Sequence, residues 1–154
     1  MGLRIVVDSG LRAAYLQAAQ YLFADATMKK IFQKLYASDK TYYIQPDCKG
    51  NDRFDPTSNT VYWDPTSALE TTTGGRQSPA LGLGHELAHA QGWDFNPDRN
   101  SALANTSDPN YNNAEERRVI VGPETFAAGT LGEDVRTDHS AKSLPTVKNP
   151  TDRW

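Results

Sequence analysis

Apolar residues recur at three- and four-residue spacing in two stretches near the start of the chain. The first stretch contains Leu11, Ala14, Tyr15, Ala18, Tyr21 and Leu22, and the second contains Met28, Ile31, Phe32, Leu35 and Tyr36. This spacing places each set on one face of an α-helix. Asp8 or Ser9 can cap the first helix and Thr27 the second, because these side chains accept hydrogen bonds from free backbone N–H groups. The pattern therefore predicts a pair of amphipathic helices.

The middle of the chain changes to short segments that favour strands. Residues 41–45 and 60–63 are rich in Tyr, Val, Ile and Thr, which are enriched in β-structure. The residues between them are typical of turns: Pro46, Gly50, Asn51, Asp52, Pro56 and Asn59. We expect a small antiparallel sheet here. The polar segment 71–77 contains Gly74 and Gly75 and predicts a flexible connection to the next helix.

A third helix is marked by signals at both of its ends. Ser78 can be the N-cap, Pro79 suits the first turn, and Gly92 is typical of a left-handed C-cap. The prediction is a helix over residues 79–91, about three and a half turns long. Its apolar positions Leu83, Leu87 and Ala90 would pack into the core.

The rest of the chain predicts a long loop and then short helices. Segment 93–113 is rich in Asn, Asp, Pro and Ser, which indicates a loop. We expect helices over 114–121 and 124–128, a further helix starting near Thr130, and an irregular tail over about 143–154. These elements together predict one α+β domain.

Composition and charge narrow the function classes. At 154 residues, with 38% hydrophobic and 23% charged residues, the chain fits one ordinary globular domain over 1–154. A net charge of -3 with scattered Lys and Arg argues against a nucleic-acid surface. The apolar run 5–7 is too short for a signal peptide or a membrane span. We expect either a cytoplasmic protein or a domain excised from a larger secreted one.

The single cysteine, Cys48, excludes an intrachain disulfide and a cysteine-rich zinc site. Its expected role is that of a small, partly buried apolar residue.

The third helix carries the motif His85-Glu86-Leu87-Ala88-His89. Residues four apart lie on one helix face, so the imidazoles of His85 and His89 can bind one zinc ion. Glu86 can act as general base on the water that the zinc activates. Two of the three histidines of the chain share this helix, which favours a metal site over coincidence.

Two further features of this region fit the same use. The small residues Gly82, Gly84 and Ala88 would leave room on the helix for metal and substrate. The predicted strand at 60–63 either runs beside the cleft, where an extended peptide could pair with it, or is an ordinary core strand.

The third protein ligand is open on spacing alone. Phe95 stands where an H-E-x-x-H-x-x-G-x-x-H motif would have its last histidine, and Asp94 would need a tight turn to reach the metal. The remaining candidates are Glu115, Glu116, Glu124, Glu133, Asp134 and His139.

Three segments together resemble the M91-type effector zinc metallopeptidases. They are GHELAHA at 84–90, NAEERRVIVG at 113–122 and GEDVR at 132–136. That family tends to show a G-H-E-L-x-H-A helix, then E-E-x-R-x-V-G, then T-E-N-x-x-R. The resemblance covers the order of elements from about residue 5 to 140, and only the helix motif is specific. The chain departs from the family at Asp134, where Asn is usual, and at Arg136, which comes one residue early.

The resemblance implies a zincin-like fold, bound Zn²⁺ and Glu133 as third ligand, with Glu116 and Glu124 as alternatives. Thr130 and Glu133 also have the spacing of a capping box, which is a purely structural role. Arg136 or His139 could stabilise the oxyanion of the transition state, and His139 could replace a tyrosine common in the family.

We therefore expect a zinc-dependent endopeptidase that hydrolyses peptide bonds. M91-type enzymes are delivered by type III secretion or occur as toxin domains at the ends of Rhs and VgrG-like proteins. The resemblance thus implies a bacterial toxin, secreted without a classical signal peptide, that acts in the cytoplasm or periplasm of a target cell. The implied partners are a protein or peptide substrate and an immunity protein. The alternatives are a zinc hydrolase of a non-protein amide and a binding module with inert zinc.

Overall fold

The structure is a computed structural model that describes residues 4–47, 49–144 and 146–154, so the expectation for Cys48 falls outside the described residues. The helices are α1 (Arg12–Leu22), α2 (Ala26–Ala37), α3 (Pro79–Phe95), α4 (Pro97–Ala104), α5 (Ala114–Val119) and α6 (Thr125–Leu131), with a 3₁₀ turn η1 (Ser9–Leu11) and a π-helical segment η2 (Ile120–Glu124). The strands are β1 (Ile5–Val7), β2 (Tyr42–Pro46), β3 (Arg53–Asp55), β4 (Thr60–Trp63), β5 (Leu69–Thr71), β6 (Arg76–Gln77), β7 (Ser107–Asp108), β8 (Asn112–Asn113) and β9 (Ala141–Ser143). The mixed content confirms the α+β class.

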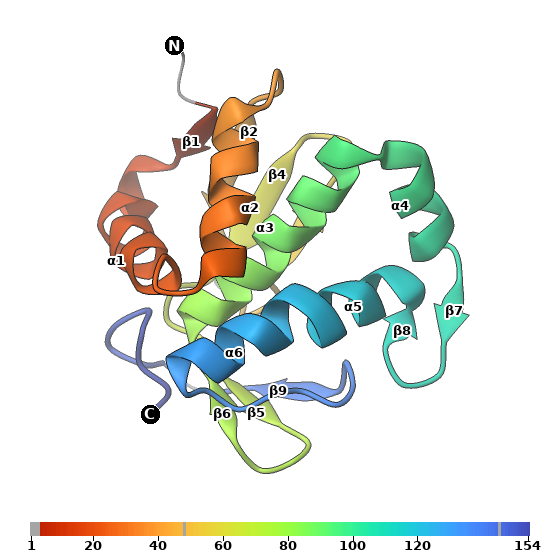
Figure 1. The fold of residues 1–154 in the computed structure, drawn as a ribbon. Coiled ribbons are helices and arrows are strands. Elements are labelled where there is room, and N and C mark those ends of the chain that lie inside the picture. The colour runs from red at the N-terminus through yellow and green to blue at the C-terminus, as the bar shows by residue number, and fades with distance from the viewer. Residues whose placement is uncertain (1–3, 48, 145) are drawn as a thin grey trace.

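The two N-terminal helices are confirmed, and both pack against α3 (Figure 1). Their buried residues include Tyr15, Leu22, Met28, Phe32 and Leu35. The second helix is capped two residues earlier than expected. Asp25 accepts a hydrogen bond from the backbone N–H of Met28 at 2.9 Å, and Thr27 lies inside the helix. Ahead of α1, Asp8 caps the short turn η1 by accepting from Gly10 N.

The main sheet has the strand order β1-β2-β4-β3 and is mixed rather than antiparallel. β1, β2 and β4 are parallel, and only β3 pairs antiparallel, with β4. The expected antiparallel pairing of the segments at 41–45 and 60–63 is therefore wrong. The reason is the connection: α1 and α2 form a crossover between β1 and β2, and β3 reverses the chain so that β4 enters parallel to β2.

Strand β4 lies inside the sheet, between β2 and β3. An extended peptide therefore has no free edge on β4, and of the two interpretations of this segment the core strand is the one that the structure supports. Val61 and Trp63 are fully buried. The indole N–H of Trp63 donates to the carbonyl oxygen of Pro79 at 2.8 Å, which ties the start of α3 to the sheet.

Helix α3 begins as the sequence predicts and ends later. Ser78 accepts from the N–H of Leu81, and the next residue is the proline of the first turn. The helix continues through Gly92 to Phe95. A side chain at Gly92 would collide with Arg118 and Asn100. This glycine therefore permits close packing inside the helix and does not end it.

The segment after α3 contains more regular structure than expected. The predicted loop at 93–113 holds α4, capped by Asn96, and the hairpin β7–β8. The chain then runs as one helical stretch through α5, η2 and α6, past Pro123, and ends at Gly132 with a φ of 69°. Proline usually breaks a helix because it lacks an N–H. Here the π-helical segment η2 carries the chain across Pro123, and Thr125 donates both its backbone N–H and, at 2.6 Å, its hydroxyl to the carbonyl oxygen of Ile120. No helix starts near Thr130, and that expectation is wrong.

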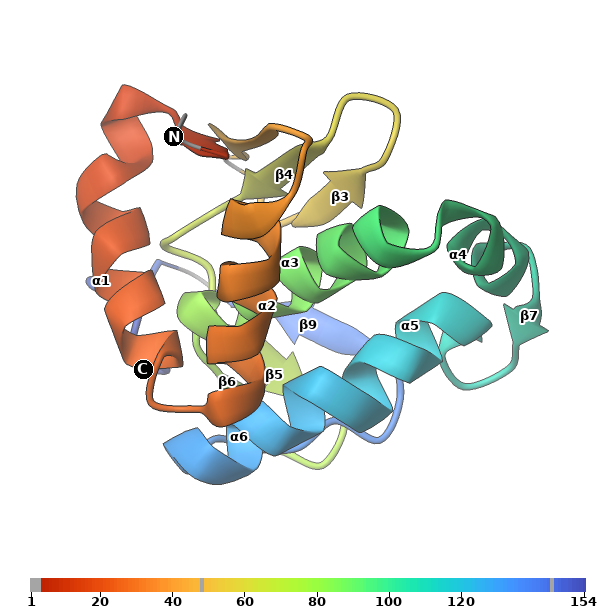
Figure 2. The ribbon, with the colours of Figure 1, turned by 45° about the horizontal axis from the view of Figure 1, so that its top comes forward.

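The expected flexible connection at 71–77 is a hairpin, whose strand β5 also pairs with β9 (Figures 1 and 2). Its turn uses Gly74 at a φ of 87°. Residues 146–154 form no helix or strand but are bound to the body of the protein. The N–H of Val147 donates to Thr66, and the carbonyl of Pro150 accepts from Ala80 N at the first turn of α3.

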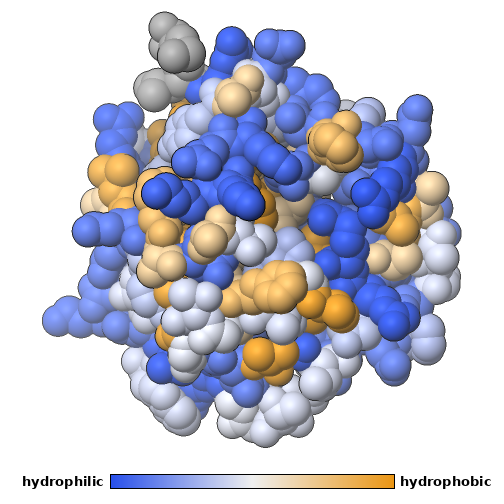
Figure 3. All heavy atoms as spheres, viewed as in Figure 1, coloured by the Kyte–Doolittle hydropathy of each residue, from blue (hydrophilic) through white to orange (hydrophobic). Residues whose placement is uncertain are grey.

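The surface in Figure 3 is mostly hydrophilic, with apolar side chains gathered over α5 and α6. Val121 and Phe126 are more than half exposed, whereas Val119, Ile120 and Ala127 are fully buried. These helices thus place one side against the core and the other in solvent. In the described ranges, no helix has the length and apolar character needed to cross a membrane.

Candidate metal centre

His85, His89 and Glu116 converge on one point between α3 and α5. The Nε2 atoms of the two histidines lie 3.0 Å apart. Glu116 Oε2 lies 2.9 Å from Nε2 of His85 and 3.2 Å from Nε2 of His89. Within the described residues, these three side chains form the one group of ligand-type atoms compact enough to hold a metal ion.

This donor set fits a small divalent cation. A tetrahedral ion with bonds of about 2.0–2.2 Å holds its ligand atoms about 3.3 Å apart, close to the separations of the three donor atoms. Both histidines are 5% exposed. Two imidazole nitrogens and one carboxylate oxygen are ligands that zinc commonly takes in catalytic sites, where a fourth position is kept for water or substrate.

Each histidine is held from behind by a second carboxylate. Nδ1 of His85 lies 2.6 Å from Glu124 Oε2, and Nδ1 of His89 lies 2.8 Å from Glu115 Oε2. A carboxylate on one ring nitrogen fixes the ring orientation and leaves the other nitrogen available as metal ligand. Both imidazoles therefore present Nε2 toward Glu116.

Both supporting carboxylates are held by arginine. Arg136 donates to Glu124 through Nε and Nη2, each at 2.7 Å, and Gln77 adds a bond of 2.9 Å. Arg118 donates to Glu115 through Nε and Nη2 at 2.5 and 3.0 Å. These contacts neutralise the buried carboxylates and fix their position, because a bidentate arginine pair has a defined geometry.

The helical stretch α5–η2–α6 delivers all three glutamates to α3. Asn113 caps α5 by accepting from Glu116 N, which places Glu115 and Glu116 in the first turn. Glu124 is the last residue of the π-helical segment η2. An insertion of this kind changes the helix register. At this segment Glu124 faces His85, which lies one turn before His89 on α3.

The electrostatics favour a cation at this point. Burial by itself lowers the pKa of His85, but hydrogen bonds with Glu116 and Glu124 outweigh burial and raise this pKa to about 10. Burial by itself raises the pKa of Glu116, yet hydrogen bonds with His139 and the two metal-site histidines hold the pKa well below its usual range. Without metal the cluster therefore keeps protons on its imidazoles, and a divalent cation can replace them.

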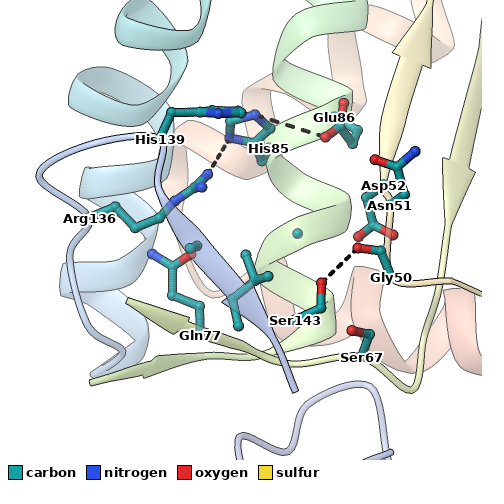
Figure 4. A pocket seen from close by; sticks show the side chains of 13 residues that line it. Gly50, Asn51, Asp52, Ser67, Gln77, His85, Glu86, Arg136, His139 and Ser143 are labelled. Carbon is teal, nitrogen blue, oxygen red and sulfur yellow. Dashed lines mark hydrogen bonds and ion pairs between the residues drawn. The ribbon is translucent and has the colours of Figure 1, made fainter. Parts of the chain in front are cut away.

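Two cavities meet in front of this cluster. One, of about 260 Å³, and a second, of about 320 Å³, both include Glu86, Asp52 and His139 in their walls. Figure 4 shows His85 and Glu86 on α3, with His139 and Arg136 on one side and the loop of Asp52 on the other. Glu86 Oε1 lies 3.9 Å from Nε2 of His85. The general-base candidate thus stands beside the metal position and faces open space.

Glu133, the third ligand favoured by the resemblance, is not brought to the histidines. Its two oxygens accept from the N–H and the hydroxyl of Ser78, at 2.6 and 2.7 Å, and from the hydroxyl of Tyr21 at 2.7 Å. It sits at the N-terminus of α3, where a carboxylate is favourable to the helix dipole. The capping-box interpretation also fails, because Thr130 lies inside α6 and donates to Asp25.

Two further candidates from the sequence, Asp94 and Asp134, form hydrogen bonds elsewhere in the fold. Asp94 accepts from Ser38 and Tyr42 and connects α3 to β2. Asp134 accepts from the hydroxyls of Thr71 and Thr73. Both aspartates are therefore used away from the metal position.

The two residues considered for the oxyanion differ in their availability. Arg136 is 8% exposed and committed to Glu124. His139 has a side chain that is 40% exposed and lies 3.4 Å from Glu116. Of the two, His139 is the one that can reach a substrate in the cavities.

The small residues of α3 serve packing more than access. A side chain at Gly84 would come within 2.9 Å of Met28 Sδ and 3.3 Å of Leu22, so this glycine lets α3 approach α1 and α2. Gly82 instead lies against the carboxylate of Asp52 in the cavity wall.

Sequence reasoning missed both Asp52 and the supporting role of Glu115. The available signal for Glu115 was its place beside Glu116 in the first helical turn after a capping Asn.

Comparison of the chain with known protein families, with characterised proteins and with solved structures finds no match.

Proposed function

We propose that this protein is a zinc-dependent metallopeptidase of zincin-like architecture. One observation supports this most: two histidines four apart on α3 and a glutamate from a later helix present three donor atoms to one point, with Glu86 beside it. In this proposal His85, His89 and Glu116 hold the ion. Glu115 and Glu124 are positioning residues behind the histidines.

The bound ion would supply a water of lowered pKa and polarise the scissile carbonyl. Glu86 accepts a proton from the attacking water and returns it to the leaving amine. Burial, the largest influence, raises the pKa of Glu86, which makes the carboxylate a stronger base. His139, on the opposite wall, donates a hydrogen bond to the carbonyl oxygen as negative charge develops on it.

An extended peptide is the substrate that the shape of the site favours. The two cavities lie on either side of the shared residues Asp52, Glu86 and His139. A chain that crosses Glu86 can therefore occupy both cavities at once. The segments GHELAHA and NAEERRVIVG, which carry the resemblance to effector peptidases, support the further proposal of a secreted toxin acting on a protein of its target cell.

Metal content and peptide cleavage test the proposal together. We expect one zinc per chain by mass spectrometry in the wild type, loss of zinc in His85→Ala and Glu116→Ala, and retention in Glu133→Ala. We expect a peptide library to be cleaved by the wild type and not by Glu86→Gln with its zinc retained. Zinc without cleavage of any peptide would favour the alternative of an inert site or a non-protein amide. A wild type that binds no zinc after reconstitution would overturn the proposal.

A further inference from the structure

Asp52 is a carboxylate in the cavity wall that the proposed chemistry does not use. Its Oδ1 accepts from the backbone N–H of Asp64 at 2.9 Å. Its Oδ2 lies against α3, where a side chain at Gly82 would come within 2.9 Å of it. The residue belongs to the wall of both cavities, together with Glu86 (Figure 4).

The neighbouring charges already have partners. Asp47 pairs with Arg53 at 3.6 Å and accepts from the N–H of Asn51. Asp64 accepts from the N–H of Gly50 and from Thr66. Across the described ranges, no Lys or Arg side chain forms an ion pair with Asp52, so its charge is left without a counter-ion.

This carboxylate is costly to ionise where it stands. Burial is the largest influence and raises its pKa to about 8, against the hydrogen bond from Asp64 N, with Glu86 and the two other aspartates adding repulsion. A partly buried carboxylate of this kind gains most from a cation placed beside it, because the cation removes the penalty on the charged form.

The cavity has room for a long side chain next to this carboxylate. Small residues form much of its wall on that side: Gly50, Ser67, Gly82, Ala141 and Ser143. The cavity measures about 260 Å³ and continues to Glu86. A lysine or arginine side chain is long enough to reach Asp52 while its backbone stays beside Glu86.

We propose that Asp52 selects a substrate with a lysine or arginine next to the scissile bond, by pairing with the cationic side chain in this cavity. The inference rests on the proposed peptidase function and names its substrate class. Asn at position 52 keeps an oxygen that can accept from Asp64 N, so Asp52→Asn removes the charge and preserves the local fold. Asp55 is the last residue of β3 and accepts hydrogen bonds from Thr57 N and the hydroxyl of Ser58, and Asp55→Asn offers a matched control.

The test compares cleavage of peptide pairs that differ only in lysine versus norleucine at each position beside the cleaved bond. At one position we expect the wild type and Asp55→Asn to prefer lysine at least tenfold in kcat/KM, and Asp52→Asn to show less than a twofold preference. A wild type without a basic preference, or a preference that survives in Asp52→Asn, would overturn the inference.

A binding measurement separates this inference from the peptidase proposal. Two zinc-loaded proteins, Glu86→Gln and the double variant Glu86→Gln/Asp52→Asn, are each titrated calorimetrically with the lysine peptides and with the norleucine peptides. If Glu86→Gln binds the lysine peptides more tightly and the double variant does not, the acidic subsite is supported even if no peptide is cleaved. If zinc-loaded Glu86→Gln binds the lysine and norleucine peptides equally, the acidic subsite is contradicted even if the protein proves to be a peptidase.

Discussion

Glu124 holds the imidazole of His85 from behind, with its Oε2 2.6 Å from Nδ1 of that ring. The hydrogen on Nδ1 then points to the carboxylate, and Nε2 is left to face Glu116 at 2.9 Å. The ring cannot turn without breaking this bond, and the two bonds from Arg136 hold the Glu124 carboxylate in place. The geometry of the candidate metal site thus depends on side chains outside its three donor residues.

Loss of either supporting carboxylate should weaken metal binding while the ligands remain. We expect Glu124→Gln and Glu115→Gln each to lower zinc affinity by about 10- to 100-fold, the range seen when such partners are removed from metal-bound histidines. Competition with a chromophoric chelator measures this. Glu70→Gln, on β5 and away from the cluster, is the control and should bind zinc as the wild type does. Unchanged affinity in Glu124→Gln would contradict the positioning role.

Glu133 should matter for stability and not for metal. Its carboxylate accepts two bonds from Ser78 at the N-cap of α3 and one from Tyr21, and it is 6% exposed. A charged acceptor of this kind contributes about 1.5–3 kcal/mol per hydrogen bond. We expect Glu133→Gln to lower the free energy of unfolding by about 2 kcal/mol in a denaturant titration and to keep a full equivalent of zinc. Loss of zinc from the folded variant would return Glu133 to the ligand set.

The sequence predicted the parts of this fold that depend on local spacing. The two apolar stripes correspond to α1 and α2, and Ser78 with Pro79 marks the start of α3. The pair His85 and His89 meets at one point because a helix alone determines that geometry.

The parts that the sequence did not predict depend on contacts between distant segments. The parallel pairing of β2 with β4 is decided by the path of the chain through β3, which short β-prone segments do not reveal. Gly92 resembles a C-cap in sequence and is a packing position in the structure, because Arg118 approaches it from α5. The choice of Glu116 over Glu133 follows from which carboxylate is already bonded to a helix N-terminus, and spacing along the chain carries no information on that.

Gly84 should tolerate no bulky side chain, because α3 passes close to α1 and α2 at this point. A Cβ atom there would lie 2.9 Å from Met28 Sδ and 3.3 Å from Leu22. Overpacking of a core typically costs about 1–3 kcal/mol, and we expect Gly84→Val to lose this amount in thermal or denaturant unfolding. Because the methionine is the nearer neighbour, Met28→Ala should restore part of the loss in the double variant. Additive losses in the double variant would mean that the strain lies elsewhere.

Asp52 should make the stability of the metal-free protein depend on pH in a defined direction. Its pKa is raised to about 8 in the folded protein, chiefly by burial, from a usual value of 3.8. Below the lower value both folded and unfolded chains hold the proton. Between the two values the unfolded chain releases its proton first, so the folded state loses stability as the pH rises, and above about 8 the loss is complete. Each pKa unit is worth about 1.4 kcal/mol at most.

Relative to the wild type, Asp52→Asn should therefore gain stability steadily between pH 5 and pH 8 and then level off, as urea titrations in the presence of a chelator would measure. Asp55→Asn should show no such gain, because hydrogen bonds from Ser58 and Thr57 outweigh desolvation and lower the pKa of the Asp55 carboxyl. A difference between Asp52→Asn and wild type that stays constant over this range would mean that Asp52 is already ionised at pH 5, and a counter-charge inside the protein would then have to be found.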